Sequence, residues 1–146
     1  MSNDKKGAVV TGAARGIGRQ IATALLEDGY GVVIADVDPA VGEQTVKELS
    51  KAHAGRVVFS KVDVTKRAEV QAAIAACRKA FGELTVMVNN AGFNKPEPFL
   101  EATEKTWHAI MDVNALGVLI GIQEAAKTMI EHGIKGKIIN TASIAG

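Results

Sequence analysis

The 146-residue sequence predicts an α/β protein built on one doubly wound parallel sheet. Short runs rich in β-branched residues alternate with longer segments whose apolar residues recur at helical spacing. The short runs are apolar on both faces, as expected of parallel strands that helices cover on each side. The first run breaks into glycines just before its helix begins, which is typical of a strand, turn and helix unit. These three observations predict the fold class.

Five strands are predicted, each bounded by glycine, proline or capping residues. They span residues 8–11, 32–35 with Asp36 at the end, 56–62, 84–88 and 136–141. Each connection is long enough to hold a helix, so the expected strand order is 3-2-1-4-5. In such a sheet, ligands bind beyond the carboxyl ends of the strands, where the winding reverses.

Four helices follow from apolar spacing and from capping residues. They are a helix with apolar residues at 17, 21, 24 and 25, a helix from Asp38 to about residue 52, a helix that Thr65 caps and that reaches residue 81, and a helix that Thr103 caps and that runs to residue 129. The last helix is apolar on several faces, which favours a second partner surface over burial within one chain.

Composition excludes several classes of partner. The net charge is +1 with no block of like charge, so neither nucleic acid nor an anionic membrane is expected as partner. Cys77 is the only cysteine and shares a helix face with Ile74 and Phe81, which indicates a core residue rather than a nucleophile. The three histidines lack ligand spacing, so no metal site is expected. The absence of a leader or a spanning segment and the single cysteine favour a cytoplasmic protein with a small-molecule ligand.

The turn between the first strand and the first helix is rich in glycine. Gly12, Gly16, Ile17 and Gly18 let the backbone approach a pyrophosphate, which the helix N-terminus can receive with its free N–H groups. Arg15 can add a phosphate contact. The alternative is a tight turn that binds no ligand.

Asp36 ends the second strand, where a carboxylate can accept hydrogen bonds from both hydroxyls of an adenosine ribose. A 2′-phosphate would be repelled there, so NAD is expected rather than NADP. Arg15 argues in the other direction, since a guanidinium near the 2′ position favours the phosphorylated cofactor. Val37 and not a basic residue follows Asp36, which supports NAD. The alternative is an aspartate that only starts the next turn.

Two further strand ends carry candidate binding residues. Asp63 and Val64 follow the third strand and could hold an adenine edge through the carboxylate and a backbone N–H. Asn90, Ala91 and Gly92 follow the fourth strand, where asparagine amides can bridge neighbouring strands and the small residues can line a ribose or nicotinamide. The alternatives are an aspartate at a helix entrance and a simple loop rich in asparagine and glycine.

Together these motifs resemble the short-chain dehydrogenase/reductase family, over the whole chain and in the same order. The resemblance implies a Rossmann fold and gives two more residues a role: Asn114 would support a water-mediated proton relay, and Ser143 would hydrogen-bond the substrate oxygen. Without the resemblance, Asn114 could satisfy a helix carbonyl distorted by Gly117, and Ser143 could be structural.

The resemblance also implies a Tyr-x-x-x-Lys pair about a dozen residues after the serine, where this chain has already ended. The only tyrosine, Tyr30, has Ile34 in place of the lysine. We therefore expect residues 1–146 to be the N-terminal portion of one cofactor-binding domain of a longer polypeptide, truncated after the fifth strand and inactive alone.

The expected parent activity is NAD(H)-dependent interconversion of a secondary alcohol and a ketone. The segments 121–123 and 136–140 are similar to acetoin, diacetyl, butanediol or sugar-alcohol reductases. The family resemblance also implies a homo-oligomer, a dimer or a tetramer, at full length. Two alternatives stay open: a nonenzymatic dinucleotide-binding module, and an NADP(H)-dependent 3-oxoacyl ketoreductase, against which Asp36 argues.

Overall fold

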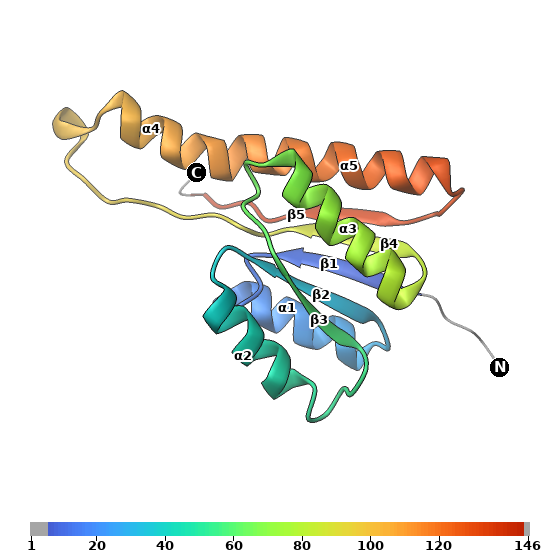
Figure 1. Cartoon of the computed structure of the whole chain (residues 1–146). Helices are drawn as coiled ribbons and strands as arrows, with labels where there is room; N and C mark the ends of the chain where they lie inside the picture. Colours follow the sequence, from blue (N-terminus) through green and yellow to red (C-terminus); the bar gives the residue numbers. More distant parts are fainter. Residues whose placement is uncertain (1–5, 145–146) are drawn as a thin grey trace.

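The sheet has five parallel strands in the order β3-β2-β1-β4-β5, as the sequence predicts. The computed structural model describes residues 6–144; Ala145 and Gly146, the end of the last segment that the sequence marks as functional, lie outside the described residues. The strands and their crossover helices are drawn in Figure 1. Their bounds are β1 Gly7–Thr11, β2 Gly31–Asp36, β3 Val57–Lys61, β4 Leu84–Asn89 and β5 Lys137–Asn140.

The first three helices match the sequence prediction in order, with differences at their ends, whereas the predicted fourth helix is one helical segment, Glu104–Glu131, that a π-helical turn divides into two α-helices. Their bounds are α1 Gly16–Glu27, α2 Pro39–Leu49, α3 Arg67–Phe81, the 3-10 turn η1 Phe99–Glu101, α4 Glu104–Met111, the π-helical turn η2 Asp112–Leu116 and α5 Gly117–Glu131. The predictions that Asp38 caps α2 and Thr103 caps α4 are confirmed, since both side chains accept a backbone N–H.

The predicted cap of the third helix is wrong. Lys66, not Thr65, precedes the first residue of α3. The Thr65 hydroxyl instead donates to Asp63 Oδ1 at 2.7 Å, and the Thr65 backbone N–H donates to the same oxygen. A local turn around the aspartate therefore uses the hydroxyl that the sequence pattern assigned to the helix.

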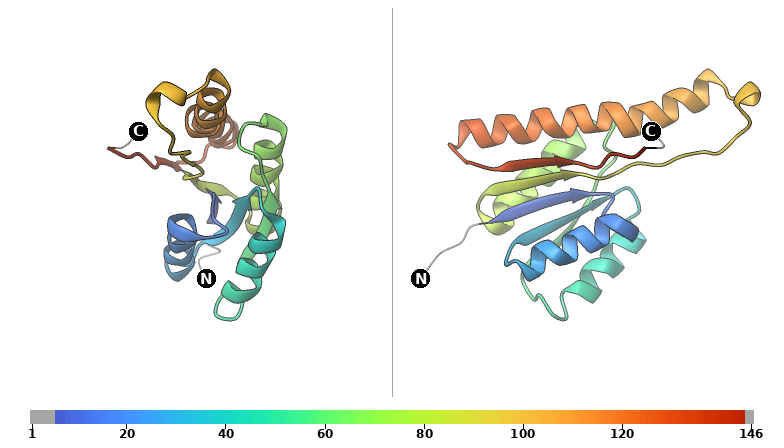
Figure 2. Two further views of the ribbon diagram at one scale, coloured as in Figure 1. Left: turned by 90° about the vertical axis from the view of Figure 1, so that its left-hand side faces the viewer. Right: turned by 180° about the vertical axis from the view of Figure 1, so that it is seen from behind.

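Two apolar cores lie on opposite faces of the sheet. Helices α1 and α2 cover one face, where Leu26 and Leu49 pack with Val10, Val32 and other strand residues. Helices α3 and α5 cover the other face, where Cys77 and Met129 belong to the second cluster of buried residues. Figure 2 shows the two helical layers from behind and from the side. Because helices cover both faces of β1, β2 and β4, the residues of these strands are apolar on both sides, as the sequence indicates, whereas β5 is mostly exposed.

Glycines allow helix α5 to approach the sheet. A Cβ at Gly117 would lie 2.6 Å from Val64 Cγ2, and a Cβ at Gly121 would collide with Asn89 Oδ1. Helix α5 thus rests on strand β4 at the level of the strand end. This close contact fixes the height of the preceding π-helical turn above the sheet.

The outer face of α4 and α5 is apolar and exposed. Its large side chains include Trp107, Met111, Leu119 and Ile130, the last of them 80% exposed. Among the described residues, the continuous helical segment 104–131 is the one segment long and apolar enough to cross a membrane by length and composition. Its inner face contributes Ile120, Ala125 and other residues to the core on the sheet, as a core helix does.

A buried carboxylate joins α3 to α5. Glu124 is 6% exposed, and its oxygens accept hydrogen bonds from Arg67, Gln71 and Lys127. These donors, first of all the Gln71 amide, hold the pKa of Glu124 below its ordinary value, although burial opposes them.

Replacement Glu124→Gln should therefore destabilise the fold by about 1–3 kcal/mol at pH 7. The lowered pKa means that Glu124 stabilises the folded state above its ordinary pKa of 4.5, and that this contribution is lost as the pH falls further. Urea unfolding of both proteins between pH 7 and pH 3 should show their free energies of unfolding converging on the acid side. Glu131→Gln, at an exposed position of the same helix, is the control and should keep a constant difference. A constant difference for Glu124→Gln would contradict the prediction.

Candidate functional site

The candidate site lies at the carboxyl ends of the strands, at the point where the sheet reverses its winding. Strand β1 pairs with β2 on one side and β4 on the other, so the chain segments that follow these three strands converge at one edge. Such a switch point is where ligands bind in doubly wound sheets. The structure brings Gly12–Gly18, Asp36 and Asn90–Gly92 to this edge, as the sequence predicts.

The glycine-rich turn needs its glycines for conformation and for space. Gly12 and Gly16 have φ values of 64° and 58°, in the left-handed region that favours glycine. A Cβ at Gly18 would collide with the Gly12 carbonyl oxygen and would lie 2.7 Å from Asn90 Nδ2. The turn is therefore pressed against the loop that follows β4. A Cβ at Gly16 would meet nothing within 4 Å, so this part of the turn faces open space.

The start of α1 is open to an anion. Arg15 precedes the helix with extended backbone angles and makes no capping hydrogen bond through its side chain, and the first turn contains no acidic residue. By contrast, the Asp38 carboxylate caps α2 and the Thr103 hydroxyl caps α4. The first N–H groups of a helix carry a partial positive charge and need partners. The backbone at Gly16, Ile17 and Gly18 therefore fits the pyrophosphate of a dinucleotide.

Asp36 joins the glycine-rich turn to the end of β2. Its Oδ2 accepts the Ala14 N–H at 3.0 Å, and its Oδ1 accepts the Asp38 N–H at 3.1 Å. Both bonds orient the carboxylate towards the turn, with the Val37 side chain beside it 62% exposed. A ribose whose diol reaches this carboxylate would have its phosphate next to the α1 N-terminus. The arrangement fits the adenosine half of a dinucleotide.

Asp63 and Val64 lie one strand further from the switch point. Asp63 accepts two hydrogen bonds from Thr65 and lies 3.7 Å from Lys66 Nζ. The Thr65 hydroxyl, above all, lowers the pKa of the Asp63 carboxyl, with Lys66 acting in the same direction. Val64 is 8% exposed and packs against Gly117, so its side chain belongs to the core.

Asn90 clamps β4 to β1 through Thr11. The Thr11 hydroxyl oxygen accepts the backbone N–H groups of Asn90 and Ala91, both at 3.0 Å, and Asn90 Nδ2 donates to the Thr11 carbonyl at 3.2 Å. On the other side, Thr141 donates its hydroxyl to Asn90 Oδ1, and Asn89 Nδ2 donates to Asn140 Oδ1. The expectation that two asparagine amides bridge neighbouring strands is confirmed. The hydrogen bonds of Thr11 and Thr141 to Asn90 were not predicted from the sequence. The pattern that could have indicated them is a hydroxyl residue at the end of each strand next to the strand that Asn90 follows.

Asn114 sits in the π-helical turn between α4 and α5 and reaches across to the loop after β4. Its Oδ1 accepts the Phe93 N–H at 3.0 Å, and its Nδ2 donates to the Phe93 carbonyl at 2.9 Å. The alternative that this amide satisfies a carbonyl of its own helix is wrong, because it binds the Phe93 backbone instead. Gly92 permits this approach, since its Cβ would lie 3.2 Å from Asn114 Oδ1. Ser143 lies three residues beyond the end of β5 on an exposed segment.

Two other predictions concern groups outside the site. Cys77 is fully buried in the core under β1, and burial raises the pKa of its thiol to about 12, so the prediction of a core residue is confirmed. Among residues 6–144, no three side chains of His, Cys, Asp or Glu gather in a way that could hold a metal ion.

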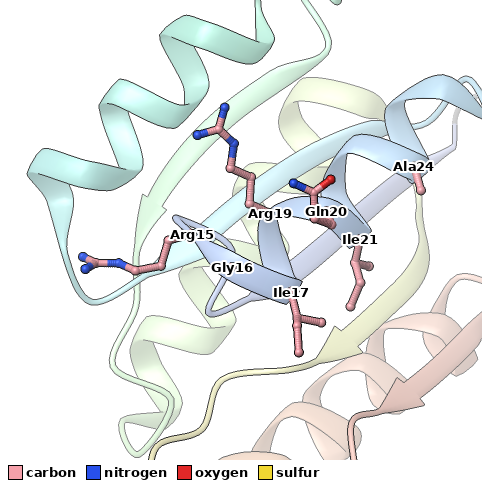
Figure 3. A pocket seen from close by; sticks show the side chains of 7 residues that line it. All are labelled: Arg15, Gly16, Ile17, Arg19, Gln20, Ile21 and Ala24. Atoms are coloured by element: carbon pink, nitrogen blue, oxygen red, sulfur yellow. The ribbon is translucent and has the colours of Figure 1, made fainter.

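An open hollow borders the glycine-rich turn along α1. Figure 3 shows Arg15, Ile17, Arg19, Gln20, Ile21 and Ala24 around it. Ile17, the first of the apolar residues that predict this helix, is 70% exposed there, because the buried stripe of α1 runs through Gly18, Ala22 and Leu26.

The fold and this edge define a dinucleotide-binding protein of the α/β class. The family model for short chain dehydrogenases matches residues 6–146. The chain therefore belongs to the short-chain dehydrogenase family, as the motif resemblance indicated. A solved short-chain dehydrogenase/reductase from Burkholderia phymatum in complex with NAD superimposes with a TM-score of 0.91 at 36% identity, covering 99% of this chain and 51% of that one.

Two curated relatives are 42% identical to the chain. They are a diacetyl reductase [(S)-acetoin forming] of Staphylococcus epidermidis, matched over 97% of this chain and 54% of the relative, and an L-2,3-butanediol dehydrogenase of Corynebacterium glutamicum, matched over 96% and 55%. The chain thus spans about half the length of the curated relatives it matches.

The Thr11 hydroxyl is expected to be required for the strand clamp. Thr11→Val keeps the shape of the side chain but leaves two backbone N–H groups without their acceptor, which should cost about 1–3 kcal/mol of folding free energy. Thr11→Ser retains the hydroxyl, and its free energy of unfolding should lie within about 1 kcal/mol of that of the parent protein. Urea unfolding of the three proteins checks the difference. Equal stability of the valine and serine variants would refute a clamp built on this oxygen.

Proposed function

We propose that residues 1–146 bind the nicotinamide adenine dinucleotide of an oxidoreductase. The observation that carries the proposal is the uncapped N-terminus of α1, opening from a glycine turn that Asp36 holds in place. Gly12, Gly16, Ile17 and Gly18 would take the pyrophosphate, and Asp36 with Val37 the adenosine ribose. For the remaining parts of the cofactor we propose Asp63 and Val64 at the adenine and Asn90, Ala91 and Gly92 at the nicotinamide ribose.

The cofactor is proposed to be NAD(H) in preference to NADP(H). The Asp36 carboxylate would accept hydrogen bonds from a ribose diol but would repel a 2′-phosphate. The NAD complex of the similar Burkholderia phymatum protein is consistent with this choice. When bound, NAD(H) supplies or accepts the hydride of the reaction.

The whole protein is proposed to interconvert a secondary alcohol and a ketone. Ser143 would hydrogen-bond the substrate oxygen, and Asn114, anchored on the Phe93 backbone, would hold a water that connects the site to solvent. A tyrosine of the family pattern, outside residues 1–146, would exchange the proton with the substrate oxygen, and the lysine of the same pattern would lower the pKa of that tyrosine and hold the nicotinamide ribose. Residues 1–146 would then be the N-terminal portion of a single domain.

Small ketones and their alcohols are the proposed substrates. The names of the two relatives at 42% identity, a diacetyl reductase and an L-2,3-butanediol dehydrogenase, support the acetoin, diacetyl and butanediol class. A sorbitol dehydrogenase of Cereibacter sphaeroides, 36% identical over 100% of this chain, keeps sugar alcohols in the same range.

The full-length protein is proposed to be a cytoplasmic homo-oligomer, a dimer or a tetramer. The exposed apolar face of α4 and α5, with Trp107, Leu119 and Ile130, supports a partner there. Burial of this face by a second copy would account for its composition without a membrane.

Calorimetric titration should show tighter binding of NAD⁺ than of NADP⁺. Asp36→Asn retains an acceptor for the Ala14 N–H but removes the charge, and should lower the preference for NAD⁺ by about tenfold. Asp63→Asn, one strand away, removes a carboxylate of similar exposure from outside the ribose position and should leave the preference within about twofold. Tighter binding of NADP⁺ by the parent protein would overturn the choice of cofactor.

In the whole protein, Ser143→Ala should lower kcat for NADH-linked reduction of diacetyl by about 100- to 1000-fold, since it removes a hydrogen bond at the reacting oxygen. Ser143→Thr keeps a hydroxyl and should retain more activity. Absorbance of NADH measures both. An alanine variant as active as the parent would argue against the assigned role.

A further inference from the structure

Arg15 does not extend into the open space beside its glycine turn. Figure 3 shows its side chain reaching away from Ile17 and Ile21, towards the loop between β2 and α2. There its Nη2 lies 2.6 Å from Asp38 Oδ2. The guanidinium closest in sequence to the proposed pyrophosphate site is therefore already paired with a carboxylate.

Asp38 is held more firmly than Arg15. Its second oxygen, Oδ1, accepts the Val41 N–H at 3.2 Å and caps α2, and Pro39 fixes the first residue of that helix. Its backbone N–H donates to Asp36. The Val41 N–H thus holds the carboxylate, and Asp36 and Pro39 hold the backbone on either side of it, while Arg15, whose side chain is 66% exposed, is the movable partner.

From this arrangement we propose that Asp38 is a second determinant of cofactor choice, because it holds Arg15 away from the 2′ position of the adenosine ribose. The inference rests on the proposed binding of a nicotinamide dinucleotide at this edge. Asp36 would act on the ribose directly, whereas Asp38 would act through Arg15. Asp38 is therefore a positioning residue, and it explains how an arginine in the turn is compatible with a preference for NAD(H).

The charges around the ribose position support these separate roles of Asp36 and Asp38. Asp36, Asp38 and Arg15 together carry one net negative charge, which disfavours a 2′-phosphate. Removal of the Asp38 charge would leave Asp36 and a released guanidinium, which can form charge-assisted hydrogen bonds to a phosphate. The neighbouring Arg19 is paired in the same way with Glu48 of α2, at 2.7 Å, but one helical turn further from the glycine turn.

Calorimetric titration of NAD⁺ and NADP⁺ into three variants tests the proposal. Asp38→Asn keeps a side-chain oxygen for the α2 cap and removes the charge, and should raise the ratio of NADP⁺ affinity to NAD⁺ affinity by about five- to tenfold. Arg15→Ala alone should change this ratio by less than about twofold, because the paired arginine contributes little. The double variant Arg15→Ala/Asp38→Asn should lose most of the gain, since the gain depends on the released guanidinium.

The matched control is Glu48→Gln, which breaks the ion pair between Arg19 of α1 and Glu48 of α2. It should leave the ratio of NADP⁺ affinity to NAD⁺ affinity within about twofold of the parent value. A gain that persists in the double variant would mean that Asp38 acts by its charge alone, and would overturn the proposed role of Arg15. An unchanged ratio in Asp38→Asn, with NAD⁺ still bound by the parent protein, would overturn this inference and leave the proposed function intact. Failure of the parent protein to bind either dinucleotide would overturn both.

Discussion

The arrangement of the site depends on the parallel pairing of β1 with β4, the contact at which the sheet reverses its winding. The pairing is completed past the ends of the strands by Thr11, whose hydroxyl oxygen takes the N–H groups of Asn90 and Ala91. The Asn90 side chain adds a second link between the loop after β4 and the glycine turn, because its Nδ2 donates to the carbonyls of Thr11 and Gly12. Asn90 extends the same clamp to Thr141, so that three polar side chains hold the ends of β1, β4 and β5 together.

Helix α5 lies over this edge of the sheet and positions the part of the site above the strands. Gly117 and Gly121 permit it to lie directly on Val64 and Asn89, where larger residues would force it away from the sheet. The π-helical turn before α5 then lies opposite the loop after β4. Both the oxygen and the nitrogen of the Asn114 side-chain amide can therefore bind the Phe93 backbone. The buried Glu124, which is tied to α3, keeps the far half of the helix in place. The packing of α5 against Val64, Asn89 and α3 thus determines the position of Asn114.

Charge pairing along α1 and α2 connects the stability of the fold with its proposed chemistry. Arg15 and Arg19 both bind carboxylates of α2, and neither is left facing the hollow beside α1 as a lone cation. Because both arginines are paired, it is the backbone N–H groups at the start of α1 that attract an anion to the turn. This distribution of charge supports the proposed site, in which the backbone would hold the pyrophosphate and side chains would select the ribose.

Much of the architecture could be predicted from the sequence, because strand periodicity, the glycine turn and the caps Asp38 and Thr103 are local in the chain. The strand order and the convergence of Gly12, Asp36 and Asn90 followed from the rules of parallel sheets. Only the tertiary structure decided which partners the polar side chains take: Thr65 with Asp63, Arg15 with Asp38, Asn114 with Phe93, and Thr11 with the loop after β4. Pairs such as the last are separated by up to 80 residues. A hydrogen bond depends on the distance and direction between two groups in space. The type of one residue in the sequence fixes neither of them, so the partner is decided only when the chain is folded.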